Sequence, residues 1–497
     1  MLVIISDLHL TDGTTGSTIS PRAFQLLNER LTELACNASY RRDDSYRPVE
    51  RIDLVLLGDV LDVIRSARWL QSSVRPWDDA GSPELFERVS GITAEILRQN
   101  ELALGEFRSL AQHGVSIPAG LQSGRPSNDE RQQVPVRIHY MVGNHDWFYH
   151  LPGEPYNRLR GQIASHMGLA TYTDAPFPHE AWESNELLQV MRRHKVFARH
   201  GDVYDPFNYE GDRDASSLGD VIVVELIDRF SEQVDRQLGD DLSDHAISGL
   251  REIDNIRPLL LVPVWIEGLL ERSCPQPATR KEVKRIWDTL ADEFLDQPFV
   301  RHRDTWCPID IVDGLQKALK FSRRLSVGWA SWIATWMAEL RGANHDSYYT
   351  HALKEQDFRN RRAKHIVYGH THRSEVVPLD ASYAEGYVLN QTYFNSGTWR
   401  RVHEQTRFAV GEHEFIPADT LTYLAFFQDD ERRGRPYETW TGSLGINPFV
   451  SNTYRIDAGT ASDAPGKPIS TPGIPIAAPH FAVPLAPRTP VGRSLVG

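Results

Sequence analysis

Four short apolar segments, each ending in a cluster of polar residues, constrain the fold of this chain more than any other feature. They read LVIISDLH from position 2, IDLVLLGD from position 52, RIHYMVGNHD from position 137 and HIVYGHTH from position 365. Runs of this kind, bounded by Gly and Asp, predict buried strands whose following loops gather at one edge of a sheet. Two weaker runs, KVFARHGD from position 195 and TYFNSGTW from position 392, predict two more strands.

Segments with helical periodicity lie between these strands. Residues 22–34 include Phe24 and Leu27 among the apolar positions of a helical pattern. A second helical stretch spans residues 83–110, and a loop containing Gly, Ser and Pro follows at 118–126. Alternation of strands and helices predicts an α/β fold in which helices are layered against sheet.

The strand series is interrupted, which predicts a core with insertions and a tail. We expect the first part of the core at residues 1–205, with a mixed polar and helical insertion at about 66–134. A mostly helical cap follows at 206–355, and the second part of the core spans 356–456. Residues 457–497 are dense in Pro, with little charge and no periodicity, and are expected to form a flexible, disordered tail.

Composition and charge argue against several classes of protein. Hydrophobic residues make up 40% and charged residues 24% of the chain, as in globular proteins, and no apolar run is long enough to span a bilayer. The chain starts with an apolar run that has no basic region before it, so we expect no secretory signal and a cytoplasmic location. The three cysteines lie far apart, which fits neither a disulfide framework nor a zinc cluster. The net charge of −13 opposes stable binding to nucleic acid, so an anionic substrate has to be attracted locally.

The polar residues that follow the predicted strands form a set of candidate metal ligands. Asp7 and His9 are two positions apart, so on a strand both side chains lie on the same face; the GHTH histidines have the same spacing. Asp59 follows a glycine that lets the backbone turn, and its single carboxylate can bridge two ions. The complete set is Asp7, His9, Asp59, Asn144, His200, His370 and His372. Oxygen and nitrogen donors without a thiolate suit two divalent ions, of which we expect Mn²⁺ before Fe²⁺ or Zn²⁺.

The motifs D-x-H, G-D-x-x-D, G-N-H-D, H-G-D and G-H-T-H occur in this order and resemble those of the calcineurin-like metallophosphoesterase superfamily. The resemblance covers the strand-bearing parts and leaves the cap and the tail unexplained. It implies a four-layer α/β/β/α sandwich with a dinuclear metal site at the strand ends. The ligands of the first ion would be Asp7, His9, Asp59 and His372, and those of the second Asp59, Asn144, His200 and His370.

The resemblance also implies an enzyme that hydrolyses a phosphomonoester or a phosphodiester in a small phosphorylated molecule. A hydroxide that bridges the two ions would attack phosphorus. The remaining histidine of the G-N-H-D motif, His145, would donate a proton to the leaving oxygen. Asp146 could orient it, although members of the superfamily also put this carboxylate to structural use. The segment GDVYD at 201–205 nearly repeats GDVLD at 58–62, and its Asp202 could accept a hydrogen bond from a ligating imidazole and fix its tautomer.

Three alternative functions remain open at this point. The HGDVYD and GHTHR segments resemble the subgroup that contains UDP-2,3-diacylglucosamine hydrolase, a lipid pyrophosphatase, although that enzyme has arginine in place of His145. Nucleases share the motifs, but the basic run RNRRAK is short, and no stable nucleic-acid binding is expected. A non-catalytic scaffold would be expected to lack ligands, whereas every ligand position is filled here.

Overall fold

The computed structural model describes residues 1–170, 175–257, 262–303, 348–380, 383–384, 387–388, 391–405 and 415–445. Contacts along the chain group Met1–Ile446 into one unit. The proline-rich tail predicted at 457–497 lies outside the described residues. None of the described helices has the length and apolarity needed to cross a membrane.

A seven-stranded mixed sheet carries three of the predicted strands. Its path runs in the order β5-β2-β1-β14-β13-β7, and β15 pairs with β14. The strands β1, β2 and β5 are parallel, whereas β14 runs antiparallel to β1. Their bounds are β1 (Leu2–Ile5), β2 (Ile52–Leu57), β5 (Val136–Met141), β7 (Ile256–Arg257), β13 (Arg400–Gln405), β14 (Phe415–Phe426) and β15 (Tyr437–Gly445).

A second, four-stranded mixed sheet contains the other three predicted strands, in the order β6-β8-β12-β9. Here β6, β8 and β12 are parallel, and β9 is antiparallel to β12. The strands are β6 (Val196–Ala198), β8 (His365–Tyr368), β9 (Ser374–Asp380) and β12 (Gln391–Ser396). All six strands predicted from the apolar runs are therefore confirmed.

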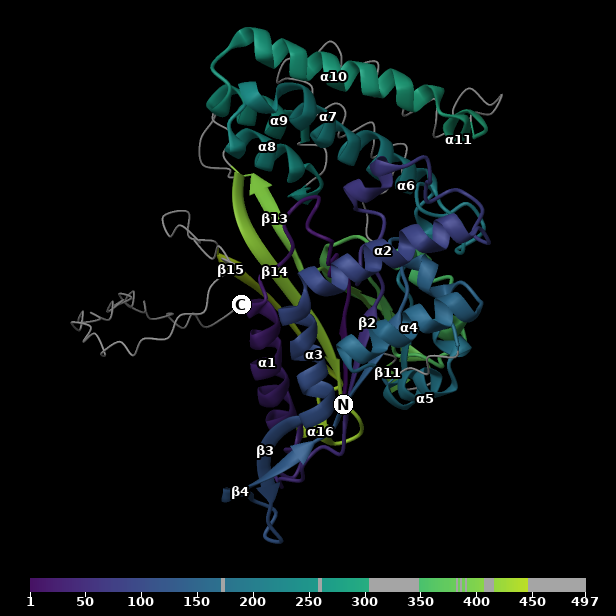
Figure 1. Ribbon diagram of the computed structural model, residues 1–497. Coiled ribbons are helices and arrows are strands. Elements are labelled where there is room, and N and C mark those ends of the chain that lie inside the picture. Colours follow the sequence, from purple (N-terminus) through teal and green to yellow (C-terminus); the bar gives the residue numbers. More distant parts are fainter. Residues whose placement is uncertain are drawn as a thin grey trace, which may run out of the picture. The chain divides into compact units, whose positions relative to one another are not determined.

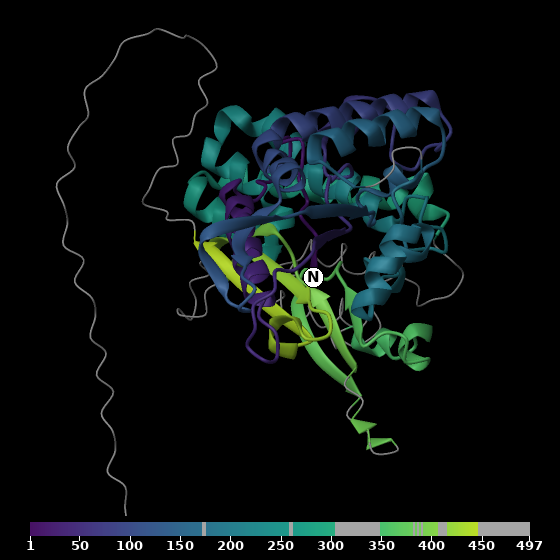
Figure 2. The ribbon, with the colours of Figure 1, turned by 90° about the horizontal axis from the view of Figure 1, so that it is seen from below.

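The two faces of the larger sheet have different neighbours. In β1, Val3 and Ile5 belong to a core cluster that also holds the apolar faces of four helices. Leu2 and Ile4 point to the other face and share a cluster with residues of β6, β8 and β12. The helices are α1 (Arg22–Ala38), α2 (Pro83–Gln99), α3 (Glu101–His113) and α4 (Glu154–Met167), drawn in purple and blue on one side of the strands in Figure 2. Both faces of β1 are thus buried, which explains its uninterrupted apolar sequence.

The second sheet also has helices on its other face. Ile366 of β8 and Tyr393 of β12 form a cluster with Ala352, against which Phe358 packs. These last two residues come from the short helices α14 (Tyr349–Ala352) and α15 (Gln356–Arg359). The described residues therefore form a mixed α/β structure with helices outside both larger sheets.

The described part of the predicted cap, residues 206–303, is mostly helical and has a hydrophobic cluster of its own. These helices gather at one end of β13 and β14 (Figure 1). The segment also contributes β7, which pairs in parallel with β13 of the core sheet. Residues 304–347 lie outside the described part of the chain. The elements are α6 (Leu218–Val221), the π-helix η5 (Ile222–Asp228), α7 (Arg229–Leu238), η6 (Gly239–Asp241), α8 (Asp244–Arg251), η7 (Ile253–Asn255), α9 (Val262–Ser273), α10 (Pro277–Asp296) and α11 (Pro298–Arg301).

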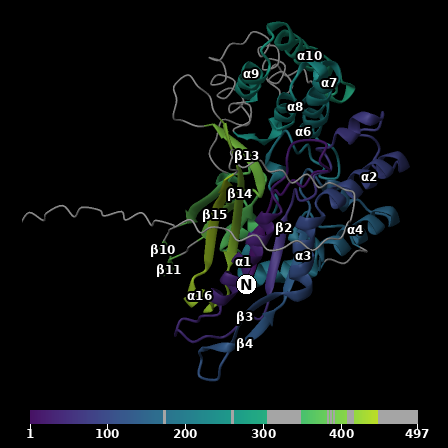
Figure 3. The same ribbon diagram turned by 60° about the vertical axis from the view of Figure 1, so that its left-hand side comes forward.

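The loop predicted at 118–126 is confirmed at 121–125, where it forms the tip of a β-hairpin whose two strands were not predicted. Strands β3 (Val115–Gly120) and β4 (Pro126–Val134) pair antiparallel. The polar residues of β4 are mostly exposed, so this strand lacks the apolar pattern of the strands in the core. Figure 3 shows this hairpin at the end of the unit opposite α7–α10. The remaining elements are η1 (Ala67–Gln71), η2 (Trp147–His150), η3 (Ala181–Glu183), α5 (Asn185–His194), η4 (Asp202–Tyr204), β10 (Tyr383–Ala384), β11 (Tyr387–Val388) and α16 (Glu431–Gly434).

Candidate metal centre

The loops that follow the parallel strands bring the predicted ligands together. The Asp7 amide donates to the Gly58 carbonyl at 3.1 Å, and the His9 amide donates to the Asp59 carbonyl at 2.9 Å. The loops after β1 and β2 therefore run side by side. From the second sheet, the Gly369 amide donates to the carbonyl of His200 at 2.7 Å and joins the loops after β8 and β6.

Backbone conformation in these loops differs from the sequence expectation. The strand β1 ends at Ile5, so Asp7 and His9 do not share a strand face; they lie in the following loop with φ of 54° and 45°. The same correction applies to His370 and His372, whose φ values are 67° and 59°. Left-handed conformations cost roughly 1–3 kcal/mol for residues other than glycine and cluster at functional sites. The residues with this strained backbone conformation are therefore ones whose side chains converge.

Gly58 allows the close approach of two of these loops. Its φ is 85°, and a Cβ atom at this position would collide with the imidazole of His200. A glycine is therefore required both by the backbone angle and by the space. The turn at Gly58 places Asp59 between the two groups of ligands, as the sequence predicted.

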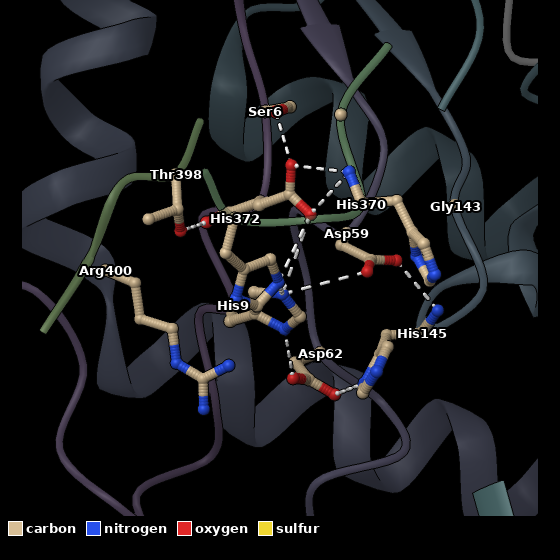
Figure 4. Close-up of polar contacts among 12 residues, drawn as sticks. Ser6, His9, Asp59, Asp62, Gly143, His145, His370, His372, Thr398 and Arg400 are labelled. Carbon is tan, nitrogen blue, oxygen red and sulfur yellow. Dashed lines mark hydrogen bonds and ion pairs between the residues drawn. The ribbon is translucent and has the colours of Figure 1, made fainter. Parts of the chain in front are cut away.

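The first group consists of Asp7, His9, Asp59 and His372, of which Figure 4 labels the last three. His9 Nε2 lies 2.9 Å from His372 Nε2 and 3.7 Å from Asp59 Oδ2. Asp7 Oδ1 lies 3.3 Å from His372 Nε2. All but His372 are almost fully buried. Ligand atoms of three residues, Asp7, His9 and His372, lie within 4.8 Å of one another.

The second group shares Asp59 with the first. His200 Nε2 lies 3.2 Å from Asp59 Oδ2 and 3.2 Å from Oδ1, the side-chain amide oxygen, of Asn144. The His200 and His370 rings have centroids 5.3 Å apart, and their donor atoms lie with that of Asp59 inside 4.8 Å. The structure therefore brings all seven predicted ligands into two adjoining groups joined by one carboxylate.

The protonation of His9 fits the role of a metal ligand. Burial, assisted by the nearby Arg400 guanidinium, lowers the pKa of His9 to about 4, so the ring is neutral near pH 7. His9 Nδ1 lies 2.7 Å from Asp62 Oδ2, which accepts a hydrogen bond from it. The unprotonated Nε2 then faces the other members of the first group, as in metal-binding histidines whose second nitrogen is held by a carboxylate.

His200 and Asp59 form an ion pair of opposite charges. Burial opposes the charged imidazole, but the carboxylates of Asp59 and Asp7 outweigh it and raise the pKa of His200 to about 10. Burial likewise opposes the charged Asp59 carboxylate, but His200 and His145 keep its pKa below the ordinary value. The proton between His200 Nε2 and Asp59 therefore lies at the position where a divalent ion would bind.

We therefore expect Mn²⁺ binding to release protons and to weaken as the pH falls, because the ion replaces the proton between His200 and Asp59. Isothermal titration in two buffers with different ionisation enthalpies counts the released protons. Identical binding enthalpies in both buffers would contradict this expectation.

His145 lies beside both groups without belonging to the proposed ligands. Its amide donates to Asp59 Oδ1 at 2.8 Å, and its Nδ1 lies 2.8 Å from Asp62 Oδ1 (Figure 4). Burial lowers the pKa of His145, but Asp62 and Asp59 outweigh that effect and raise it to about 10. The ring therefore carries a proton near pH 7, and the carboxylate that holds its orientation is Asp62.

The two residues expected behind the ligands, Asp146 and Asp202, have other contacts. Asp146 accepts from the Gly143 amide at 2.6 Å and from the Tyr140 hydroxyl at 2.6 Å, so it shapes the loop after β5 rather than orienting His145. Asp202 pairs with a guanidinium and not with an imidazole, accepting from Arg213 at 2.7 and 3.0 Å.

The Leu57 carbonyl accepts a hydrogen bond from His200 Nδ1 at 2.9 Å. A backbone oxygen therefore fixes the tautomer of this imidazole, the role expected of Asp202.

Three further side chains around the centre had no role in the sequence interpretation. Asp62, the last residue of GDVLD, contacts both His9 and His145. Asp205, at the same position of GDVYD, lies 3.1 Å from His370 Nε2. Arg400 points toward the first group (Figure 4) and donates to the cap residue Asn255 at 2.7 Å. The repeated G-D-x-x-D spacing was the one signal that could have identified the two aspartates.

Comparison with known proteins adds nothing to this geometry. No protein-family model matches the chain, and no curated protein matches it. The function of the centre is therefore inferred from its own residues.

Proposed function

We propose that this protein is a metal-dependent phosphoester hydrolase that acts on a phosphomonoester or a phosphodiester. The observation that carries the proposal is the pair of buried ligand groups that share Asp59 and lie beside His145. Helices outside two sheets that pack on each other support, in addition, the four-layer metallophosphoesterase sandwich as the fold.

The donor set fits two divalent ions of the Mn²⁺, Fe²⁺ or Zn²⁺ type. The residues that would hold the first ion are Asp7, His9, Asp59 and His372, and those for the second are Asp59, Asn144, His200 and His370. When bound, two such ions activate a water molecule as nucleophile and neutralise charge on the phosphoryl group.

The protein's own residues supply the proton for the leaving group. Asp62 holds His145 through Nδ1, so the ring is fixed in orientation and charged near pH 7. A charged imidazole beside the phosphoryl group can stabilise developing negative charge and donate a proton to the departing oxygen. Because Asp62 also holds His9, one carboxylate couples the position of this acid to that of a ligand.

Hydrolysis of two model esters tests the proposal. The full chain is stripped with a chelator, reloaded with Mn²⁺ and assayed with p-nitrophenyl phosphate and bis-p-nitrophenyl phosphate. We expect Mn²⁺-dependent hydrolysis, and the preferred ester distinguishes a monoesterase from a diesterase. The same slow rate for both esters with and without Mn²⁺ would contradict the proposal.

An Asp62→Asn substitution is expected to shift the pH dependence of kcat. Loss of this carboxylate lowers the pKa of His145, because Asp62 is its largest source of stabilising negative charge. His145 acts in its protonated form, so the fall of kcat at high pH moves to lower pH. The measurement is a pH profile of kcat at saturating Mn²⁺, since disturbing His9 also weakens metal binding by about 10–100-fold. A rate loss without a shifted profile would mean that His145 is not the acid.

A further inference from the structure

A second cluster of histidine and carboxylate side chains lies outside the ligand groups around Asp59. His150 Nδ1 lies 2.7 Å from Asp214 Oδ1, and His179 Nε2 lies 2.9 Å from the same oxygen. The three donor atoms lie within 4.8 Å of one another. Two imidazoles thus converge on one carboxylate.

Three separate segments supply these side chains. His150 is the last residue of η2, His179 precedes η3, and Asp214 lies in the loop that leads to α6. His179 is only 4% exposed, and the other two residues are half-buried. The cluster is therefore built into the fold rather than being a chance encounter of surface side chains.

Glu183 determines which nitrogen of His150 faces the cluster. Its Oε2 atom lies 3.3 Å from His150 Nε2 and accepts from the amide of His179 at 3.0 Å. Glu183 thereby holds Nε2, so Nδ1 is the nitrogen of His150 that faces Asp214 and that an ion in the cluster would meet. Metal-binding histidines are commonly held in this way, with a carboxylate on the nitrogen that does not bind the ion.

The spacing of the donor atoms is close to that of a tetrahedral zinc site. Ligands at ~2.0–2.2 Å from zinc in a tetrahedral arrangement lie about 3.3–3.5 Å from one another. The observed separations of 2.7 and 2.9 Å from Asp214 Oδ1 to the two ring nitrogens would have to widen by about 0.4–0.8 Å on binding. Two imidazoles with one carboxylate favour Zn²⁺ over Mg²⁺ or Ca²⁺, which prefer oxygen ligands.

We propose that His150, His179 and Asp214 bind a further divalent ion of the zinc type. Its role would be to fasten the loop between β6 and α6 to the core. That loop reaches the other centre, because Asp205 lies 3.1 Å from His370 Nε2 and Asn208 accepts from the Asn144 side chain at 3.3 Å.

Zinc content of the full-length protein tests this site. The chain is stripped with a chelator, reloaded with Zn²⁺, freed of loose metal by gel filtration and measured by mass spectrometry of the metal. The variants are Asp214→Ala and His150→Ala, each alone and combined with Asp59→Asn, which disables the other centre. Asp129→Ala, on the exposed face of β4, is the matched carboxylate control.

We expect Asp214→Ala and His150→Ala each to bind one ion fewer per chain than their parent, and the control to bind the same number. The loss should also occur in the Asp59→Asn background, which separates this site from the proposed hydrolytic centre. Circular dichroism verifies folding; if Asp214→Ala is unfolded, the His150→Ala pair decides. Equal zinc content in folded variants and parents of both backgrounds would overturn the proposal.

Discussion

Replacing Asp59 by Asn is expected to lower the rate of hydrolysis to about a thousandth of the wild-type rate or less. Its carboxylate faces His9 Nε2 at 3.7 Å and His200 Nε2 at 3.2 Å, so it is shared by both ligand groups. Charge stabilisation by metal ions contributes several kcal/mol to such reactions, and about 1.4 kcal/mol corresponds to a tenfold change in rate. The measurement is kcat/KM for the preferred ester at saturating Mn²⁺, together with bound Mn²⁺ per chain.

Measuring bound Mn²⁺ shows whether the loss of activity is accompanied by a loss of metal. We expect Asp59→Asn to lose Mn²⁺ along with activity, because both groups lose a negative ligand while the shape of the side chain is kept. Asp129→Asn on the exposed strand β4 serves as the control and should resemble the wild type in both readings. Full activity in folded Asp59→Asn would exclude this residue as a bridging ligand.

Replacing His145 by Ala is expected to have a different signature. We predict a loss of kcat of about 10²–10⁴-fold, the usual contribution of a positioned general acid, with unchanged Mn²⁺ content. The reason is that its ring contacts Asp62 and lies outside the seven proposed ligands, although its amide donates to Asp59. The alanine variant keeps that amide, so the metal groups should remain in place.

Comparing esters with different leaving groups provides a second test of His145 as the acid. An ester whose leaving group needs no proton should lose less rate in His145→Ala than an alkyl ester does, because only the latter depends on the acid. His113→Ala, which removes an exposed histidine at the end of α3, is the matched control. Loss of Mn²⁺ from His145→Ala would instead make this residue a ligand.

The strands, and the convergence of the candidate ligands at their ends, were accessible from the sequence for a physical reason. A strand buried on both faces has to be mostly apolar, as β1 is and as β2 is apart from Asp53, and this makes its end easy to recognise. Chemistry-bearing residues such as Asp59 and His370 then stand out, since they are the first polar residues after an apolar run.

Long-range and backbone features were not accessible in the same way. The pattern D-x-H suggested a strand, but β1 ends before Asp7, and the left-handed angles there are imposed by contacts with the loop at Gly58. Partners of a buried charge depend on tertiary distance rather than on sequence distance. Asp62 therefore holds His145, although Asp146 is its neighbour in the chain.

Anomalous X-ray scattering from crystals of the Mn²⁺-loaded protein tests the central claim most directly. The account predicts two manganese peaks that share the Asp59 carboxylate, one beside His9 and His372 and the other beside His200 and His370. Crystals of Asp59→Asn should lack both peaks. A single ion beside Asp59, or no manganese beside Asp59 in the wild type, would contradict the proposed dinuclear centre.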